Sequence, residues 1–186
     1  MKRILMIVAL LMGMTMASQA QFLRNVPDMK GKTVVGGNLG LGLNGRNFSF
    51  TIAPQIGYRI VNAVEVGVRG SYNLSVDFNP YYGNSSLHCI GISPYTTIQV
   101  YKGICLHAEY EKLYCMERYN HQTVELQHNW YNSVMIGGGY RSYYGNNSYA
   151  FLLILYNLNW DNQELNLGGS PYISPLQLRV GYCFGL

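Results

Sequence analysis

Residues 64–78 read VEVGVRGSYNLSVDF, and every even position in this stretch except Gly70 is apolar or aromatic. The odd positions carry Glu65, Arg69 and Asp77 among glycine, serine and asparagine. Because successive side chains of a strand point to opposite faces, this alternation predicts a strand with one apolar and one polar face. The stretch is too long for a typical soluble strand, but it suits a tilted strand that crosses a bilayer and continues beyond it.

The first 20 residues have the pattern of a secretory signal peptide. Lys2 and Arg3 precede an apolar stretch at positions 4–16, and small residues end the segment at Ala20. The apolar stretch falls short of the roughly 20 residues that a membrane-spanning helix needs. Cleavage before Gln21 is therefore favoured over a retained helix, and we expect export.

The composition also favours a chain that turns apolar side chains toward lipid. Hydrophobic residues make up 48% and charged residues 12% of the sequence, whereas charged residues make up about 25% of a typical soluble domain. Beyond the first 20 residues no apolar run is long enough for a spanning helix. Any membrane span there must therefore be made of strands.

The net charge argues against nucleic-acid binding. The formal charge of +4 includes Lys2 and Arg3, and without them 13 − 2 = 11 basic residues face 9 acidic ones. The charge without the leader is thus 11 − 9 = +2, and the basic residues are scattered singly. Phosphate binding requires a clustered basic surface.

Alternating or apolar stretches, separated by polar and Gly- or Asn-rich breaks, predict eight strands. After the first hairpin, short and long breaks alternate, as in outer-membrane barrels with short periplasmic turns and longer external loops. An even strand number also closes the sheet without a free edge. We therefore predict an all-β fold, an eight-stranded antiparallel up-and-down transmembrane β-barrel over residues 33–186, after a periplasmic tail at 21–32. The predicted strands span 34–43, 48–58, 64–78, 87–101, 104–116, 130–140, 149–158 and 176–186.

The C-terminus carries a residue-specific motif. Its pattern, Arg179-x-Gly181-x-x-Phe184-x-Leu186, resembles the sorting signal that bacterial outer-membrane barrels present to their assembly machinery, with leucine in place of the commoner terminal phenylalanine. Together with PQIGYR at 54–59, it resembles the outer-membrane β-barrel domain family of Gram-negative bacteria. The resemblance implies a small porin-like barrel of OmpX or OmpA type in the cell outer membrane, and it implies no single activity.

Charged residues on the polar faces predict a network inside the barrel. His107, Glu109 and Glu111 take successive inward positions about 6.6 Å apart, a spacing that also suits a divalent metal or acid–base group. We favour a salt-bridge network, because charges buried in a narrow lumen must be compensated. No catalytic, cofactor or metal site is predicted. The predicted lumen charge network comprises Arg59, Glu65, Arg69, His107, Glu109, Glu111, Arg141 and Arg179.

The predicted function is a non-enzymatic structural or adhesive role in the cell envelope. A narrow solute channel is the weaker alternative, because eight strands leave room only for the barrel's own side chains. Met135, Tyr131, Phe151, Leu153 and Leu155 have the inward phase to fill that space.

A lipid-modifying enzyme of the lipid A acyl hydrolase or transferase type is the second alternative. His88 and His128 lie near outer strand ends, but Ser93 and Ser133 fall on the opposite face by parity. The expected partners are instead outer-membrane lipid and the assembly machinery. The polar, tyrosine-bearing loops at 79–86, 117–129 and 159–172 could bind an extracellular protein or glycan.

Two further features can be read from the fourth and fifth predicted strands. A three-residue turn at 101–103, with Gly103 in the left-handed conformation, would place Cys89 opposite Cys115. An oxidising periplasm then predicts a disulfide between them, whereas Cys105 and Cys183 have the phase of buried thiols. Pro94 is expected to cause a bulge or local distortion, since it removes a ladder donor.

Overall fold

The computed structural model describes residues 28–44, 47–79, 83–119, 122–124, 129–144, 147–161, 171–172 and 174–186. The predicted signal peptide and most of the predicted tail lie outside these residues. Within the described residues, no helix has the length and apolar character needed to cross a membrane. The strands found there are β1 (Thr33–Asn44), β2 (Asn47–Val61), β3 (Val64–Asn79), β4 (Gly83–Tyr101), β5 (Ile104–Tyr119), β6 (Gln122–Val124), β7 (Trp130–Tyr144), β8 (Ser148–Asn157) and β9 (Leu176–Gly185).

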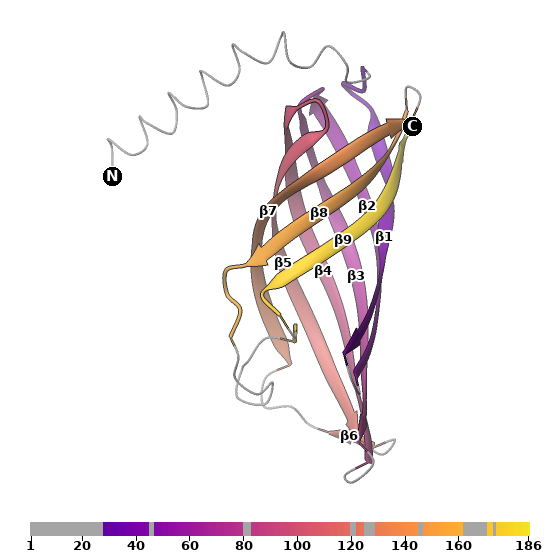
Figure 1. Cartoon of the computed structure of the whole chain (residues 1–186), viewed down its shortest axis with the longest axis vertical. Coiled ribbons are helices and arrows are strands. Elements are labelled where there is room, and N and C mark those ends of the chain that lie inside the picture. Colours follow the sequence, from indigo (N-terminus) through magenta and orange to yellow (C-terminus); the bar gives the residue numbers. More distant parts are fainter. Residues whose placement is uncertain are drawn as a thin grey trace, which may run out of the picture.

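Eight of these strands form one closed antiparallel barrel (Figure 1). The order runs β4-β3-β2-β1-β9-β8-β7-β5, and pairing between β4 and β5 closes the ring. The short β6 pairs only with the far end of β5. The predicted all-β, eight-stranded antiparallel barrel is therefore confirmed, with β6 as an addition that the sequence had not indicated.

The tight turns and the C-terminus lie together at one end of the barrel, which we call the turn end. Asn62 and Ala63 join β2 to β3, and Lys102 and Gly103 join β4 to β5. The backbone N–H of Leu186 donates to the carbonyl of residue 33 at the start of β1, over 2.8 Å. Figure 1 shows this end opposite the one that bears β6, which we call the loop end.

Alternation along the strands separates an interior from an exterior. On β8, Phe151, Leu153 and Leu155 are at most 5% exposed, whereas Leu152 and Ile154 are 42% and 52% exposed. The same alternation of burial runs along β9 and much of β7. The odd side chains of β8 thus fill the barrel as predicted, together with Met135 and Tyr131 of β7.

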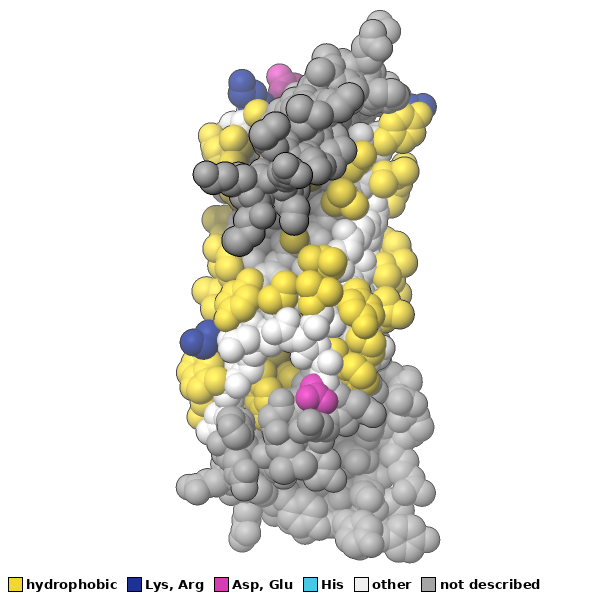
Figure 2. All heavy atoms as spheres, turned by 90° about the vertical axis from the view of Figure 1, so that its left-hand side faces the viewer, with side chains coloured by type: hydrophobic (Ala, Val, Ile, Leu, Met, Phe, Trp, Pro, Cys, Tyr) yellow, Lys and Arg dark blue, Asp and Glu magenta, His cyan; other side chains and the backbone are white. Residues whose placement is uncertain are grey.

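The outer wall of the barrel is apolar on every strand of the ring. Leu39 of β1, Ile90 of β4 and Leu178 of β9 are 64%, 56% and 66% exposed. Figure 2 shows hydrophobic side chains spread over the wall of one face, with few charged ones among them. Lys112, an outward residue of β5, places its ammonium 4.9 Å from the ring centre of Trp130, a cation–π contact.

The turn and the proline differ in part from expectation. Lys102 has a left-handed φ of 40°, and Gly103 also has a positive φ, of 157°. Pro94 brings no bulge: Ile92 pairs with Lys112 and Tyr95 with Glu109, so the register is the same on both sides. Proline has no N–H to donate, and the ladder between β4 and β5 is interrupted at Ser93 and Pro94 without a change of register.

The strands reach further at the loop end than predicted. β4 already begins at Gly83, so most of the expected loop at 79–86 is strand. β5 continues to Tyr119 and forms a hairpin with β6 inside the expected loop at 117–129. The wall formed by β3, β4 and β5 therefore extends well beyond β8 and β9, which have 10 residues each.

Candidate functional site

A buried carboxylate cluster lies inside the barrel near the turn end, centred on Glu65 of β3. Its Oε2 accepts hydrogen bonds from Arg141 at 2.8 Å and from Arg59 at 3.3 Å. The hydroxyls of Tyr95 and Tyr149 donate to the same carboxylate over 3.1 Å and 2.9 Å. Two guanidinium groups and two phenols thus replace the water that this carboxylate loses on burial.

A second cluster lies further along the lumen and is centred on Glu109 of β5. Oε1 of this carboxylate is 2.5 Å from Arg69 and 2.6 Å from Arg179. Oε2 is 3.1 Å from Nε2 of His107, whose Nδ1 is 2.8 Å from the Thr97 hydroxyl. Both carboxylate oxygens are therefore engaged, and the imidazole is oriented by partners at both nitrogens.

Glu111 forms the third level of the lumen, closest to the loop end. It accepts a hydrogen bond from the Ser71 hydroxyl at 2.9 Å and another from the Tyr172 hydroxyl. Tyr172 precedes β9, and its ring packs against the buried side chains of the interior. The sequence had placed it on the external loop at 159–172. Tyr172 does lie between β8 and β9, but its side chain turns inward and its hydroxyl reaches a buried carboxylate.

All eight members of the predicted lumen charge network are buried in the barrel. The structure groups them around three carboxylates rather than in one cluster. Sequence reasoning missed the phenols Tyr95 and Tyr149 and the hydroxyl of Thr97, although their odd positions carry the inward phase. Within the described residues, no group of three or more His, Cys, Asp or Glu side chains is arranged to hold a metal ion.

The cysteines occupy two environments. Cys89 and Cys115 pair across β4 and β5, and the structure joins them by a disulfide on the lumen side near the loop end. Cys105 and Cys183 are buried free thiols. The four side chains thus lie where the inward phase of their strands puts them.

If the protein is exported as the sequence predicts, we expect the Cys89–Cys115 disulfide to form. Unreduced, denatured protein should then react with an alkylating agent at two thiols, Cys105 and Cys183, and reduced protein at four. The double variant C89S/C115S should lose roughly 2–4 kcal/mol of unfolding free energy, the usual range for a native disulfide. C105S is the matched control. Alkylation of four thiols without reduction would contradict the prediction.

The residues of the predicted sorting motif lie on both faces of β9. Arg179 points into the lumen and binds Glu109, while Phe184 and Leu186 are 45% and 73% exposed on the outer wall. At Gly181 a Cβ atom would come within 2.4 Å of the Phe151 ring. The arginine and the glycine therefore have structural roles besides any recognition by an assembly machinery.

Of the two histidines considered for enzymatic chemistry, His88 is described by the structure and His128 is not. Nδ1 of His88 is 2.8 Å from the Tyr72 hydroxyl, so this imidazole already has a phenol partner. His128 lies outside the described residues, so the position of its side chain is not discussed.

Comparisons with known proteins found similarity in structure but no match in sequence. No family model matches the chain, and no curated protein matches it. Among solved structures, it is similar to the N-terminal β-barrel domain of Pseudomonas aeruginosa OprF, with a TM-score of 0.47 and 10% sequence identity. The match covers 84% of this chain and 98% of that one. The barrel fold of this chain follows from its own strand pairing.

Proposed function

We propose that this chain is an integral outer-membrane protein whose non-enzymatic barrel is a rigid scaffold for surface contacts. The observation that carries the proposal is an inverted pattern of burial. Apolar side chains are exposed on all eight wall strands, while arginines and glutamates are buried inside. Soluble proteins bury most of their apolar side chains, whereas membrane barrels turn them toward lipid. The leader pattern at residues 1–20 supports export.

The filled interior supports a scaffold over a solute channel. The Glu65 and Glu109 clusters cross the lumen from several strands, with Phe151 and Leu153 packed among the buried residues. Met29 is fully buried in the same hydrophobic cluster as Val34, at the turn end. Eight strands leave little space beyond these side chains.

The uneven length of the strands supports a contact role at the loop end. β4 has 19 residues, whereas β8 and β9 have 10 each. A tilted strand of about 9–11 residues is enough to cross a bilayer. The extra length of β3, β4 and β5 would therefore stand outside the membrane as a sheet that an extracellular protein or glycan could contact.

Localisation, conductance and lipid analysis test the three parts of this proposal. Expressed in Gram-negative cells, the chain should appear in the outer-membrane fraction and migrate faster on a detergent gel before heating than after it. A variant lacking residues 176–186 should lose this heat-dependent shift, because the ring cannot close without β9.

Two further experiments test the scaffold role. Purified protein should give no discrete channel openings in planar bilayers. Cells that lack the protein should have the same lipid A acylation as cells that contain it. A soluble product, reproducible openings or an acyl-chain difference would each contradict the corresponding part.

A further inference from the structure

Lys112 of β5 is a charged residue on the otherwise apolar outer wall of the barrel. Its side chain is exposed on the outward face of the strand. The outward side chains that the structure describes on the eight wall strands carry two cations, Lys112 and Arg118, and no carboxylate. These cations are 112 − 104 = 8 and 118 − 104 = 14 residues from the start of β5. Since about 9–11 residues of a tilted strand cross a bilayer, Lys112 lies within the span and Arg118 beyond it.

Lys112 lies at the level of the outer leaflet, if the barrel spans a bilayer as proposed. With a rise of about 3.3 Å per residue and a tilt of about 40°, it is roughly 20 Å above the turn end, in the outer part of an apolar band about 25 Å tall. Its ammonium is 4.9 Å from the ring centre of Trp130 on the neighbouring strand β7. Trp130 pairs with Tyr114, which is two residues nearer the loop end than Lys112. The lysine side chain is thus directed toward the lipid headgroups.

The surroundings of Lys112 favour an anion that comes from outside the chain. Asn132 of β7 pairs directly with Lys112, and both side chains are exposed. The Tyr110 hydroxyl donates to Oδ1 of Asn132 over 2.9 Å, which leaves the two N–H donors of this amide for another acceptor. An ammonium and an amide side by side can both donate to the oxygens of a phosphate. Because the described outward side chains of the wall include no carboxylate, a bound molecule has to supply the counter-charge.

An apolar groove of about 610 Å³ lies on the same outer face of the barrel. Ala108 lines it and is four residues from Lys112 on the same face of β5, or about 13 Å closer to the turn end along the strand. Thr96 of β4 and Ile136 of β7 pair with Ala108 and line the groove beside it. The other outward residues of the lining are Ile98, Leu106 and Tyr156. The groove is thus suited to a hydrocarbon chain that runs down the wall from the level of Lys112.

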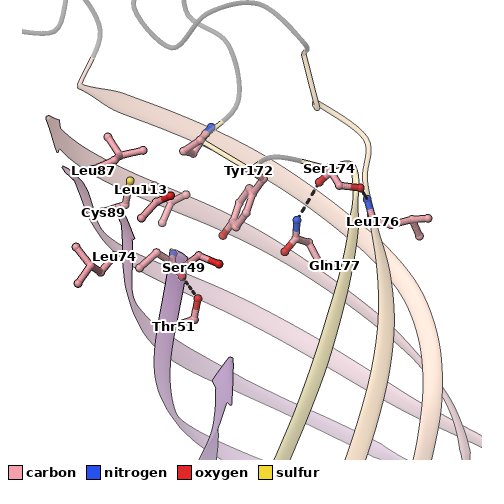
Figure 3. Close-up of a pocket in the computed structure, with 13 residues that line it drawn as sticks. Ser49, Thr51, Leu74, Leu87, Cys89, Leu113, Tyr172, Ser174, Leu176 and Gln177 are labelled. Carbon is pink, nitrogen blue, oxygen red and sulfur yellow. Dashed lines mark hydrogen bonds between the residues drawn. The ribbon is translucent and has the colours of Figure 1, made fainter. Parts of the chain in front are cut away.

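The interior of the barrel offers a less suitable place for such a chain. A cavity of about 240 Å³ lies at the loop end, and Leu87 and Leu113 form part of its wall (Figure 3). Thr51, Ser174 and Gln177 bring hydroxyl and amide groups to the same wall. A hydrocarbon chain in this cavity would remove water from these polar groups without replacing its hydrogen bonds, which is unfavourable. The outer groove carries no such cost, because it opens on the bilayer.

We propose that the outer face of β4, β5, β7 and β8 binds one molecule of lipid A, with a phosphate beside Lys112 and Asn132 and an acyl chain in the groove at Ala108. Lipid A carries phosphate on a sugar headgroup and belongs to the outer leaflet, the level at which Lys112 lies when the longer loops face outward. The distance of about 13 Å between Lys112 and Ala108 is about half of an apolar band of about 25 Å, so the acyl chains of one leaflet reach the groove. This inference rests on the proposed membrane location.

Displacement of a brominated lipid tests the binding. The chain has two tryptophans, so W160F leaves Trp130, which contacts Lys112, as the fluorescent reporter. In vesicles of brominated phosphatidylcholine its emission should be quenched, and lipid A that replaces a brominated neighbour should restore it. Half-recovery should need about fivefold less lipid A than unbrominated phosphatidylcholine, the attraction expected of one lysine for anionic lipid. Dephosphorylated lipid A should lose this preference. Phosphatidylglycerol should show a smaller one, because its phosphodiester carries one charge and a phosphomonoester carries about −1.5 to −2.

Matched variants in the W160F background separate the two parts of the site. K112M should abolish the preference for lipid A, whereas R118M, which removes the same charge beyond the span, should keep it. A108F fills the groove and should weaken the preference, whereas A150F enlarges a half-buried outward alanine of β8 that does not line the groove and should not.

Each part of the inference can be overturned. An unchanged preference in K112M would exclude the phosphate contact, and equal preferences in A108F and A150F would exclude the acyl chain from the groove. Equal recovery by phosphatidylglycerol and lipid A would overturn the assignment to lipid A. A barrel with a normal heat-dependent shift but no lipid preference refutes only this inference, whereas a soluble product refutes the proposed function as well.

Discussion

Replacing Glu65 with glutamine should cost about 3–5 kcal/mol of unfolding free energy, the usual result of removing one partner from a buried ion pair. Glutamine keeps the size of the side chain but leaves Arg59 and Arg141 without the carboxylate they now share. Tyr95 and Tyr149 also lose a charged acceptor. The change should be measured by urea unfolding of the barrel in lipid vesicles.

E111Q is the matched control for this loss, because it removes the same charge at another level of the lumen. The partners of Glu111 are the hydroxyls of Ser71 and Tyr172, not a guanidinium. Its loss should therefore cost roughly 1 kcal/mol, the scale of an ordinary hydrogen bond. Adding R141M to E65Q should restore part of the stability, since it removes one uncompensated cation. Equal losses in E65Q and E111Q would contradict the ion-pair explanation.

A charge placed in the middle of the outer wall should be almost as damaging. Ile154 of β8 is 52% exposed and lies roughly 15 Å from the turn end, near the centre of an apolar band about 25 Å tall. Arginine at a bilayer midplane costs ~2–4 kcal/mol. I154R should therefore lose that amount in the same urea experiment.

L158R is the position-matched control, since Leu158 is 54% exposed but lies just past the end of β8. At the membrane interface arginine costs about 0–1 kcal/mol. The difference between the two variants measures depth in the bilayer, because the exposed fraction of the two side chains is nearly the same. If I154R and L158R are equally stable, the wall does not face lipid at this level and the proposed location fails.

The local patterns of the sequence were sufficient to predict the barrel fold. A period of two residues assigns each side chain to a face without knowledge of any other strand, so the inward Arg69 and the outward Ile154 are both predictable. The tight turn at Lys102 and Gly103 then sets the register of β4 against β5, and with it the pairing of Cys89 with Cys115. Of the two effects expected at Pro94, the structure shows the local distortion and not the bulge, because the missing donor left a gap in pairing rather than an inserted residue.

Closure of the barrel determined which charged side chains meet in the lumen, which the local sequence pattern does not predict. Arg179 and Glu109 are 70 residues apart in sequence, and only the pairing of β1 with β9 brings their strands around one lumen. The entry of Tyr172 into that lumen and the early end of pairing at Leu39 likewise depend on how the two ends of the sheet meet. The sequence by itself determined the strands and their two faces, because side-chain alternation is local. The partner of each charge and the early end of pairing between β1 and β9 followed only from the tertiary structure, because both depend on contacts across the closed ring.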